Sequence, residues 1–321
     1  MNIRNYLITS WFPLREWPSG SCLVALMLVL LIPRIGSAHG IVGDRIVLSP
    51  IVGNDAFPDN ALTLAARRSN YEFSLLPALE KQLSDNSSLL FVSSWQRITP
   101  GAGRRRQEGF GDLSIYYRRA VFISAPHEME FTLSPFVVLP LGNRRIADQG
   151  YTHLGGELLL AKGLGDLPDQ PSLKYLRPFA LQAELGYAGR IQGPANSDVV
   201  GNLELEYSLE YLNRFVERLN LGRPLIQLVP YVQFNYAQSF IASRLTTKPD
   251  FRLTPGLAYL GDYCELSIGA QVALNDAAPS GDRVAVIGLV EIFYDNIFPP
   301  LGWNPSWTHI VQPPQIEDGN S

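Results

Sequence analysis

The stretch 201–211 constrains the fold of this chain more than any other part of its sequence. Apolar and polar residues alternate along it. The odd-numbered positions, which we call its apolar parity, hold Leu203, Leu205, Tyr207, Leu209 and Tyr211, and the even-numbered positions, its polar parity, hold Glu204, Glu206, Ser208 and Glu210. Because successive side chains of a β-strand point to opposite faces, a strand here has one apolar, aromatic face and one acidic face. Such a strand fits the wall of a membrane β-barrel, whose outer face meets lipid and whose inner face lines the lumen.

A period of two residues returns along most of the chain. The expected strands are 71–83, 89–98, 112–124, 127–139, 155–162, 178–190, 201–211, 225–239, 251–260, 263–275 and 283–298. Gly261 and Asp262 are a hairpin signal between two of them. At about 9 to 15 residues these strands are longer than the strands of most globular sheets and long enough to cross a membrane. We therefore predict an all-β protein, a transmembrane antiparallel β-barrel of about 12 strands, within a range of about 10 to 14.

The first 38 residues have the features of an export signal. Arg4 and Arg15 precede the apolar run 22–33, which at about a dozen residues is too short for a membrane-spanning helix. A group of small residues, of the kind that a signal peptidase recognises, ends at Ala38. We therefore predict a signal peptide over 1–38 and cleavage after Ala38. A signal anchor that stays attached is the alternative. No later run approaches the roughly 18 apolar residues of a transmembrane helix.

The remaining chain divides into three parts. Residues 39–70 form an N-terminal extension, expected to be a plug or a periplasmic segment with a helical turn around 61–67. The barrel covers 71–298, and the C-terminal tail covers 299–321. Apolar residues at helical spacing over 212–220 predict a short amphipathic helix at one end of the barrel.

Charge and cysteine content exclude two classes of protein. The chain has 26 basic and 30 acidic side chains and a net charge of −4, which argues against a nucleic-acid binder. One of its two cysteines, Cys22, lies in the signal, so Cys264 cannot form an intramolecular disulfide and is expected to pack as a small apolar residue. No cofactor is predicted. His39 would present an amine and an imidazole that copper favours, but we predict no metal site there.

Several turn and strand motifs resemble a known group of proteins. They are Arg97-Ile98-Thr99-Pro100, Gly109-Phe110-Gly111-Asp112-Leu113, and the runs 163–168 and 173–180. Together they resemble poorly characterised Gram-negative outer-membrane β-barrels, described as transporters or as channels of phenol-degradation pathways. The resemblance covers most of 39–298. It implies a barrel fold and location in the cell outer membrane, and it carries over no substrate and no functional residue.

Two further groups of residues bear on partners. Arg104, Arg105, Arg106, Arg144 and Arg145 lie in expected loops, where they could bind lipopolysaccharide phosphates or simply be solvated. Many outer-membrane barrels end on an aromatic residue that the barrel-assembly machinery recognises. Here the nearest candidate is Phe298, which is followed by the tail. The expected partners are thus outer-membrane lipid and lipopolysaccharide, the assembly machinery and small solutes. The sequence does not define an oligomeric state.

The polar parity supplies the candidate functional residues. The candidates for a lumen-facing position are Glu72, Glu128, Glu130, Glu184, Glu204, Glu206, Glu210, Glu265 and Arg118. Rings of carboxylates in a pore favour cations. We therefore predict a channel or transporter for small solutes with an acidic lumen. The alternative is a non-conducting barrel for structure or docking, its lumen closed by salt bridges and by the 39–70 segment.

Signals of enzymatic activity are weak. The sequence has no Gly-x-Ser-x-Gly motif. His127 or His153 could act as the base of an outer-membrane lipid hydrolase, but no matching serine accompanies either. We predict that the protein is not an enzyme. A hydrolase barrel and a soluble secreted β-sandwich are the less favoured alternatives.

Overall fold

The computed structural model describes residues 41–43, 45–99, 106–143, 150–192, 196–241, 244–245 and 248–298. Several sequence predictions lie outside the described residues: the signal 1–38, His39, Arg104, Arg105, Arg144, Arg145 and the tail 299–321. Within the described ranges, no helix combines the length and the apolar character needed to cross a membrane.

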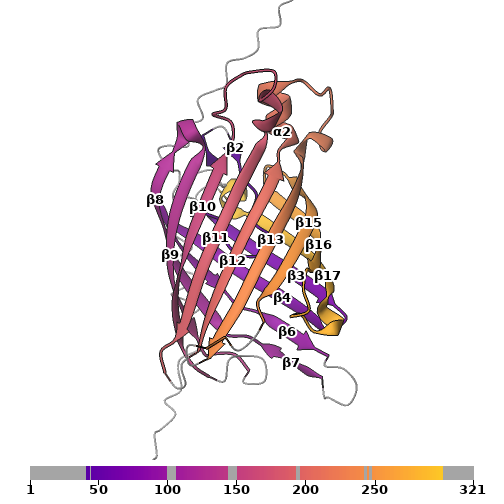
Figure 1. Ribbon diagram of the computed structural model, residues 1–321. Coiled ribbons are helices and arrows are strands. Elements are labelled where there is room, and N and C mark those ends of the chain that lie inside the picture. The colour runs from indigo at the N-terminus through magenta and orange to yellow at the C-terminus, as the bar shows by residue number, and fades with distance from the viewer. Residues whose placement is uncertain are drawn as a thin grey trace, which may run out of the picture. The chain divides into compact units, whose positions relative to one another are not determined.

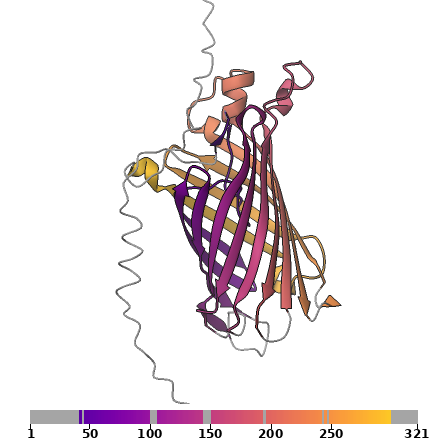
Figure 2. The same ribbon diagram turned by 90° about the vertical axis from the view of Figure 1, so that its left-hand side faces the viewer.

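A closed antiparallel barrel of twelve strands dominates the described chain, as the sequence predicted. Its strands are β3 (Ala61–Ser69), β4 (Glu72–Ser84), β5 (Ser87–Val92), β8 (Leu113–Ser124), β9 (Met129–Leu139), β10 (His153–Gly163), β11 (Phe179–Arg190), β12 (Asn196–Tyr207), β13 (Leu228–Ile241), β15 (Asp250–Leu260), β16 (Cys264–Ala273) and β17 (Val284–Phe293). Each pairs with its neighbour along the wall, and β17 pairs back onto β3 to close the barrel (Figures 1 and 2). Closure leaves no long sheet edge without a partner.

Short strands extend the wall beside β4 and β13. β6 (Trp95–Ile98) pairs with the first part of β4, whereas β5 pairs with its last part. The predicted strand 89–98 is therefore two strands, separated at Ser93 and Ser94. β7 (Gln107–Phe110) pairs with β6 and precedes β8, and β14 (Arg244–Leu245) pairs with β13. A hydrogen bond joins the two breaks in the wall: the amide of Gly111, between β7 and β8, donates to the carbonyl of Ser94, between β5 and β6, at 2.8 Å.

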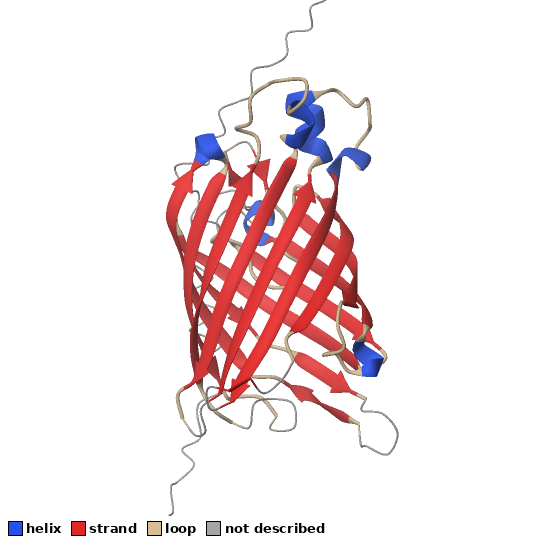
Figure 3. Ribbon diagram, viewed as in Figure 1, coloured by secondary structure: helices blue, strands red, loops and turns tan. Residues whose placement is uncertain are grey.

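The two ends of the barrel carry different connections (Figure 3). At the end we call the α2 end, the connections hold η1 (Ala125–His127), η2 (Lys174–Leu176), α2 (Leu209–Tyr211), η3 (Leu212–Val216) and η4 (Leu225–Gln227), and α3 (Tyr294–Ile297) follows β17. The opposite end, the β7 end, holds β7 and η5 (Ser280–Asp282). β3 begins and β17 ends at the α2 end.

The helix predicted over 212–220 is displaced toward the N-terminus. Strand β12 stops at Tyr207, and the Ser208 hydroxyl accepts a hydrogen bond from the amide of Tyr211. A serine in this position satisfies a free amide of the first helical turn, so it starts the helix and ends the strand. The helical residues then run from Leu209 to Val216.

The helical turn predicted around 61–67 is wrong. These residues belong to β3, which pairs with β17 on one side and β4 on the other. Leu62 and Leu64 point outward, and Thr63, Ala65 and Arg67 point toward the lumen. The barrel therefore begins at Ala61, ten residues before the predicted boundary, and β3 is the strand missing from the sequence prediction.

Burial along β12 is reversed relative to a water-soluble sheet. Leu203 and Leu205 are 45% and 39% exposed, whereas Glu204 and Glu206 are 2% and 1% exposed. Leucine and valine side chains are also exposed on the outer faces of β3, β16 and β17. An apolar exterior around a polar interior is typical of a barrel wall in contact with lipid.

Candidate functional site

A segment of the chain runs inside the barrel. β1 (Ile41–Val42) and β2 (Arg45–Ile46) form a small hairpin, and the chain continues to Asn60 before entering β3. We call residues 45–60 the lumenal segment. Its backbone amides donate hydrogen bonds to inward side chains: Leu48 to Glu206 at 3.0 Å, Ser49 to Glu265 at 3.0 Å, Val52 to Gln233 at 3.2 Å, Asn54 to Glu184 at 3.0 Å and Asp59 to Glu80 at 3.1 Å.

Arg45 fixes the start of this segment at the α2 end. Its guanidinium is buried, donates to Glu128 at 3.0 Å and to the Pro178 carbonyl at 2.9 Å, and lies 4.2 Å from the centre of the Tyr211 ring. Glu128 sits between η1 and β9 with a φ of 45°, so it belongs to a turn and not to a strand. A buried charge of this kind is tolerated because it is paired and hydrogen-bonded.

A second buried ion-pair cluster joins the middle of the segment to the wall. Arg118 on β8 donates to the carboxylates of Glu80 on β4 and Asp55 on the segment. Its side chain also reaches the Asp55 carbonyl. Nearby, the Thr132 hydroxyl donates to the Ala56 carbonyl at 2.5 Å. These contacts position the segment against β8 and β9.

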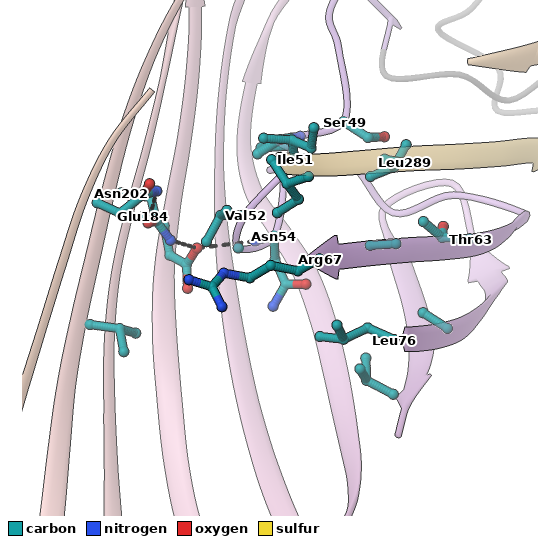
Figure 4. Close-up of a pocket in the computed structure, with 18 of the residues that line it drawn as sticks. Ser49, Ile51, Val52, Asn54, Thr63, Arg67, Leu76, Glu184, Asn202 and Leu289 are labelled. Carbon is teal, nitrogen blue, oxygen red and sulfur yellow. Dashed lines mark hydrogen bonds between the residues drawn. The ribbon is translucent and has the colours of Figure 1, made fainter. Parts of the chain in front are cut away.

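The tip of the segment lies against two glutamates. Asn54 donates its side-chain amide to Glu157 at 3.0 Å, and Asn202 donates to the same Glu184 carboxylate that accepts the Asn54 backbone amide (Figure 4). Gly53 has a φ of 94°, and a Cβ there would lie 2.1 Å from the Glu184 carboxylate. Only glycine allows this close approach without strain.

A cavity of 570 Å³ adjoins the segment (Figure 4). Its lining reaches Asp282 in η5 at the β7 end. Its apolar lining includes Leu76, Leu90, Val92, Ile287 and Leu289 on β4, β5 and β17. Its polar lining includes Asn202, Asn235, Gln271 and eight carboxyl side chains beside three arginines. The volume falls within the range of about 300–1,000 Å³ typical of small-molecule sites.

A network of charges borders the cavity toward the β7 end. Asp282 in η5 bridges two arginines, accepting from Arg67 at 2.8 Å and from Arg252 at 2.8 Å. Both guanidiniums also donate to Gln271, at 2.9 and 3.2 Å. Burial alone would raise the pKa of Asp282, but hydrogen bonds from Ser69 and Arg252 and the charge of Arg67 hold that pKa below its usual value.

Three cavity carboxylates remain without an ion-pair partner among the described residues. Each cavity arginine is matched by two carboxylates: Arg67 by Glu72 and Asp282, Arg118 by Asp55 and Glu80, Arg252 by Asp250 and Asp282. Glu157, Glu184 and Glu291 accept hydrogen bonds from neutral donors, among them groups of Ser49, Asn54, Thr63 and Asn202. In their ionised form, unmatched carboxylates facing a cavity attract cations and repel anions.

The structure separates the nine residues predicted to face the lumen. Glu72, Glu184 and Arg118 line the cavity. Glu206 and Glu265 are buried against the lumenal segment, and Glu204 is buried beside Gln182, which donates to the Leu48 carbonyl of that segment. Glu130 is fully buried, with neither carboxylate oxygen bonded to another described residue. Glu128 pairs with Arg45. Glu210 was predicted to face the lumen from a strand over 201–211, but that strand ends at Tyr207 and Glu210 lies in α2. Whether any of them sets a charge preference stays a prediction.

Sequence reasoning missed three glutamates at this site. Glu80, Glu157 and Glu291 all line the cavity. Each lies within an expected strand, and a complete assignment of parity would have included all three. Pro77 interrupts the alternation before Glu80, and two glycines precede Glu157. These irregularities weaken the two-residue pattern on which the selection rested.

The candidate histidines are far apart in the fold. His127 lies in η1 at the α2 end and contacts Asp166 at 3.1 Å, whereas His153 begins β10 at the β7 end. Cys264 is unbonded and half-buried, on the outward parity of β16. In the part of the chain that the structure describes, no group of three histidine, cysteine, aspartate or glutamate side chains could hold a metal ion.

Comparisons with known proteins show similarity in structure alone. No family profile and no curated protein matches the sequence. The COG4313 outer membrane channel from Pseudomonas putida F1 superposes with a TM-score of 0.51 and 10% identity, over 77% of this chain and 99% of the other. LpxR from Salmonella typhimurium gives a TM-score of 0.41 at 10% identity, over 73% of this chain and 99% of the other. The KdgM porin gives a TM-score of 0.41 at 9% identity, over 72% of this chain and 98% of the other. The chain thus has a closed twelve-stranded barrel fold, and this fold is similar to that of the outer membrane channel.

Proposed function

We propose that this chain is an outer-membrane channel or transporter for small solutes, exported by a cleaved signal peptide and inserted by the barrel-assembly machinery. The observation that carries the proposal is the 570 Å³ cavity inside a closed barrel whose exterior is apolar. The structural similarity to an outer-membrane channel supports it. The apolar wall of the cavity also suits solutes with an aromatic or alkyl body.

The pathway is proposed to prefer cations. Glu157, Glu184 and Glu291 face the cavity without a matching positive charge among the described residues. In a confined, partly apolar space, such charges raise the local concentration of cations and exclude anions. Glu204 and Glu206 lie beside the lumenal segment and do not line the cavity, so their effect on selectivity should be smaller.

Replacement of one cavity carboxylate tests this pathway. Glu184→Gln keeps an oxygen that can accept from Asn54 and Asn202 but removes the charge. In planar bilayers with a salt gradient, we expect the reversal potential to move toward zero. Glu108→Gln is the matched control, because Glu108 is exposed on β7 outside the cavity. Equal reversal potentials for wild type, Glu184→Gln and Glu108→Gln would contradict the assignment.

A non-conducting barrel is the second candidate function. It is favoured by the lumenal segment, which bonds inward side chains on β4, β11, β12, β13 and β16. In that case the segment would close the lumen and stabilise the wall. A folded barrel that shows no conductance steps above the empty bilayer would support this second function and refute the first.

A further inference from the structure

Two arginines flank an aromatic ring on the outer face of the barrel. Arg68 on β3 is the cross-strand partner of Phe73 on β4, and Phe73 is the partner of Arg97 on β6. The three side chains therefore form one row across three neighbouring strands. Arg67, the residue before Arg68, points into the cavity, so Arg68 and its row point outward.

The row is compact and lines a small pocket. The guanidinium carbons of Arg68 and Arg97 lie 6.0 and 5.6 Å from the centre of the Phe73 ring. Both arginines line a pocket of 130 Å³ together with Arg106 and the turn after β3. Three guanidiniums thus converge on a space large enough for one tetrahedral anion.

Two of these guanidiniums have no carboxylate partner among the described residues. Arg106 donates to Glu108 at 2.6 Å, but no ion pair of Arg68 or Arg97 is present. Glu72 also borders the pocket, and its carboxylate is 3.5 Å from Arg67 on the lumenal side. The outer side of this pocket therefore has positive charges in excess. A planar guanidinium can donate two parallel hydrogen bonds to a phosphate, which makes arginine well suited to that group.

On β3 and β4 the row marks the end of the apolar exterior, next to the turn that joins these two strands. Toward the middle of the barrel lie Leu64, which is exposed, and Trp95, whose ring centre is 6.0 Å from that of Phe73. Toward the β7 end lies the turn at Asn70 and Tyr71. Aromatic and basic side chains at such a boundary are at the height of lipid headgroups.

We propose that Arg68 and Arg97 bind the phosphate group of an anionic membrane lipid, whose acyl chains lie on Phe73, Trp95 and Leu64. This inference rests on the membrane location in the proposed function, but not on conduction. The adjoining apolar surface favours a lipid over free phosphate, because only a lipid also covers the exposed Leu64 and the half-buried Phe73 and Trp95.

Binding to a matched pair of lipids tests the proposal. Full-length protein in a neutral detergent is titrated with dioleoyl phosphatidic acid, dioleoylglycerol, lipid A or inorganic phosphate, and bound species are counted by native mass spectrometry. We expect phosphatidic acid or lipid A to bind at least about tenfold more tightly than dioleoylglycerol, which has the same acyl chains as phosphatidic acid but no phosphate. The double variant Arg68→Gln/Arg97→Gln should lose this preference. Arg223→Gln, an exposed arginine at the α2 end, should keep it.

Other outcomes overturn the proposal. Equal binding of phosphatidic acid and dioleoylglycerol, or full binding by the double variant, removes the phosphate site. Competition by inorganic phosphate at the affinity of the lipid removes the lipid assignment. A heat-dependent gel shift verifies that each variant is a folded barrel. Conductance is measured separately, so a wild type that binds phosphatidic acid without conducting refutes the channel and leaves this lipid site intact.

Discussion

Arg118 connects the lumenal segment to the barrel wall, and Arg118→Met should release the segment. The arginine is 1% exposed and contacts the carboxylates of Asp55 and Glu80. Methionine preserves much of the volume but leaves both carboxylates buried without their cation. Removal of one partner from a buried ion pair costs about 3–5 kcal/mol.

That cost should fall mainly on the segment. The wall strands hold each other through continuous backbone pairing, whereas the hydrogen bonds that join residues 47–60 to the wall involve wall side chains. A loss of about 3 kcal/mol would lower the ratio of seated to released segment by a factor on the order of a hundred. The amides of Leu48, Ser49 and Asn54 would then lose their carboxylate acceptors.

Hydrogen–deuterium exchange of the peptide 45–60 measures this release directly. In Arg118→Met we expect exchange to accelerate by about a hundredfold, because local opening controls the exchange of protected amides. Arg106→Met removes an exposed ion pair and should leave the exchange unchanged. If Arg118→Met forms a folded barrel with wild-type exchange in 45–60, the reasoning about this ion pair is refuted.

Two other predictions concern the loops and the outer wall. Hydrogen bonds from Tyr175 and Lys174 lower the pKa of Glu217, so their contact is complete at neutral pH and is lost as the pH falls through that lowered pKa. Titration of the Glu217 carboxyl by nuclear magnetic resonance in micelles should show a midpoint below the usual glutamate value, and an ordinary midpoint would contradict the contact. Leu203→Arg places a charge on the outer face and should destabilise the barrel in liposomes by about 2–4 kcal/mol. Urea unfolding measures this loss, with Leu221→Arg in the loop at the α2 end as the control that should change little.

Local alternation was sufficient to predict most of the wall. The parity of Leu203, Glu204, Leu205 and Glu206 sets which side faces outward, and the structure follows it. Strand β3 escaped prediction because its alanines, leucines and arginines are good helix formers. Pairing with β17 and β4 overrides that propensity, and it depends on residues far away in the sequence.

The lumenal segment could not be derived from local pattern. Its residues have no strict period, and their positions depend on distant side chains: Leu48 and Glu206 are 158 positions apart. For the same reason, the alternation predicted that Glu184 and Glu206 both point inward but could not predict which of them lines the cavity. The segment covers Glu206, whereas Glu184 contacts the segment tip and also lines the cavity.

The proposed channel is tested most directly by single-channel recording of the unmodified full-length protein in a planar bilayer with a potassium chloride gradient. We predict discrete conductance steps and a reversal potential of the sign expected for potassium passing more readily than chloride. A protein that shows the heat-dependent gel shift of a folded barrel but gives no steps would contradict the channel. Steps with a reversal potential of the opposite sign would contradict the role assigned to the unpaired carboxylates Glu157, Glu184 and Glu291.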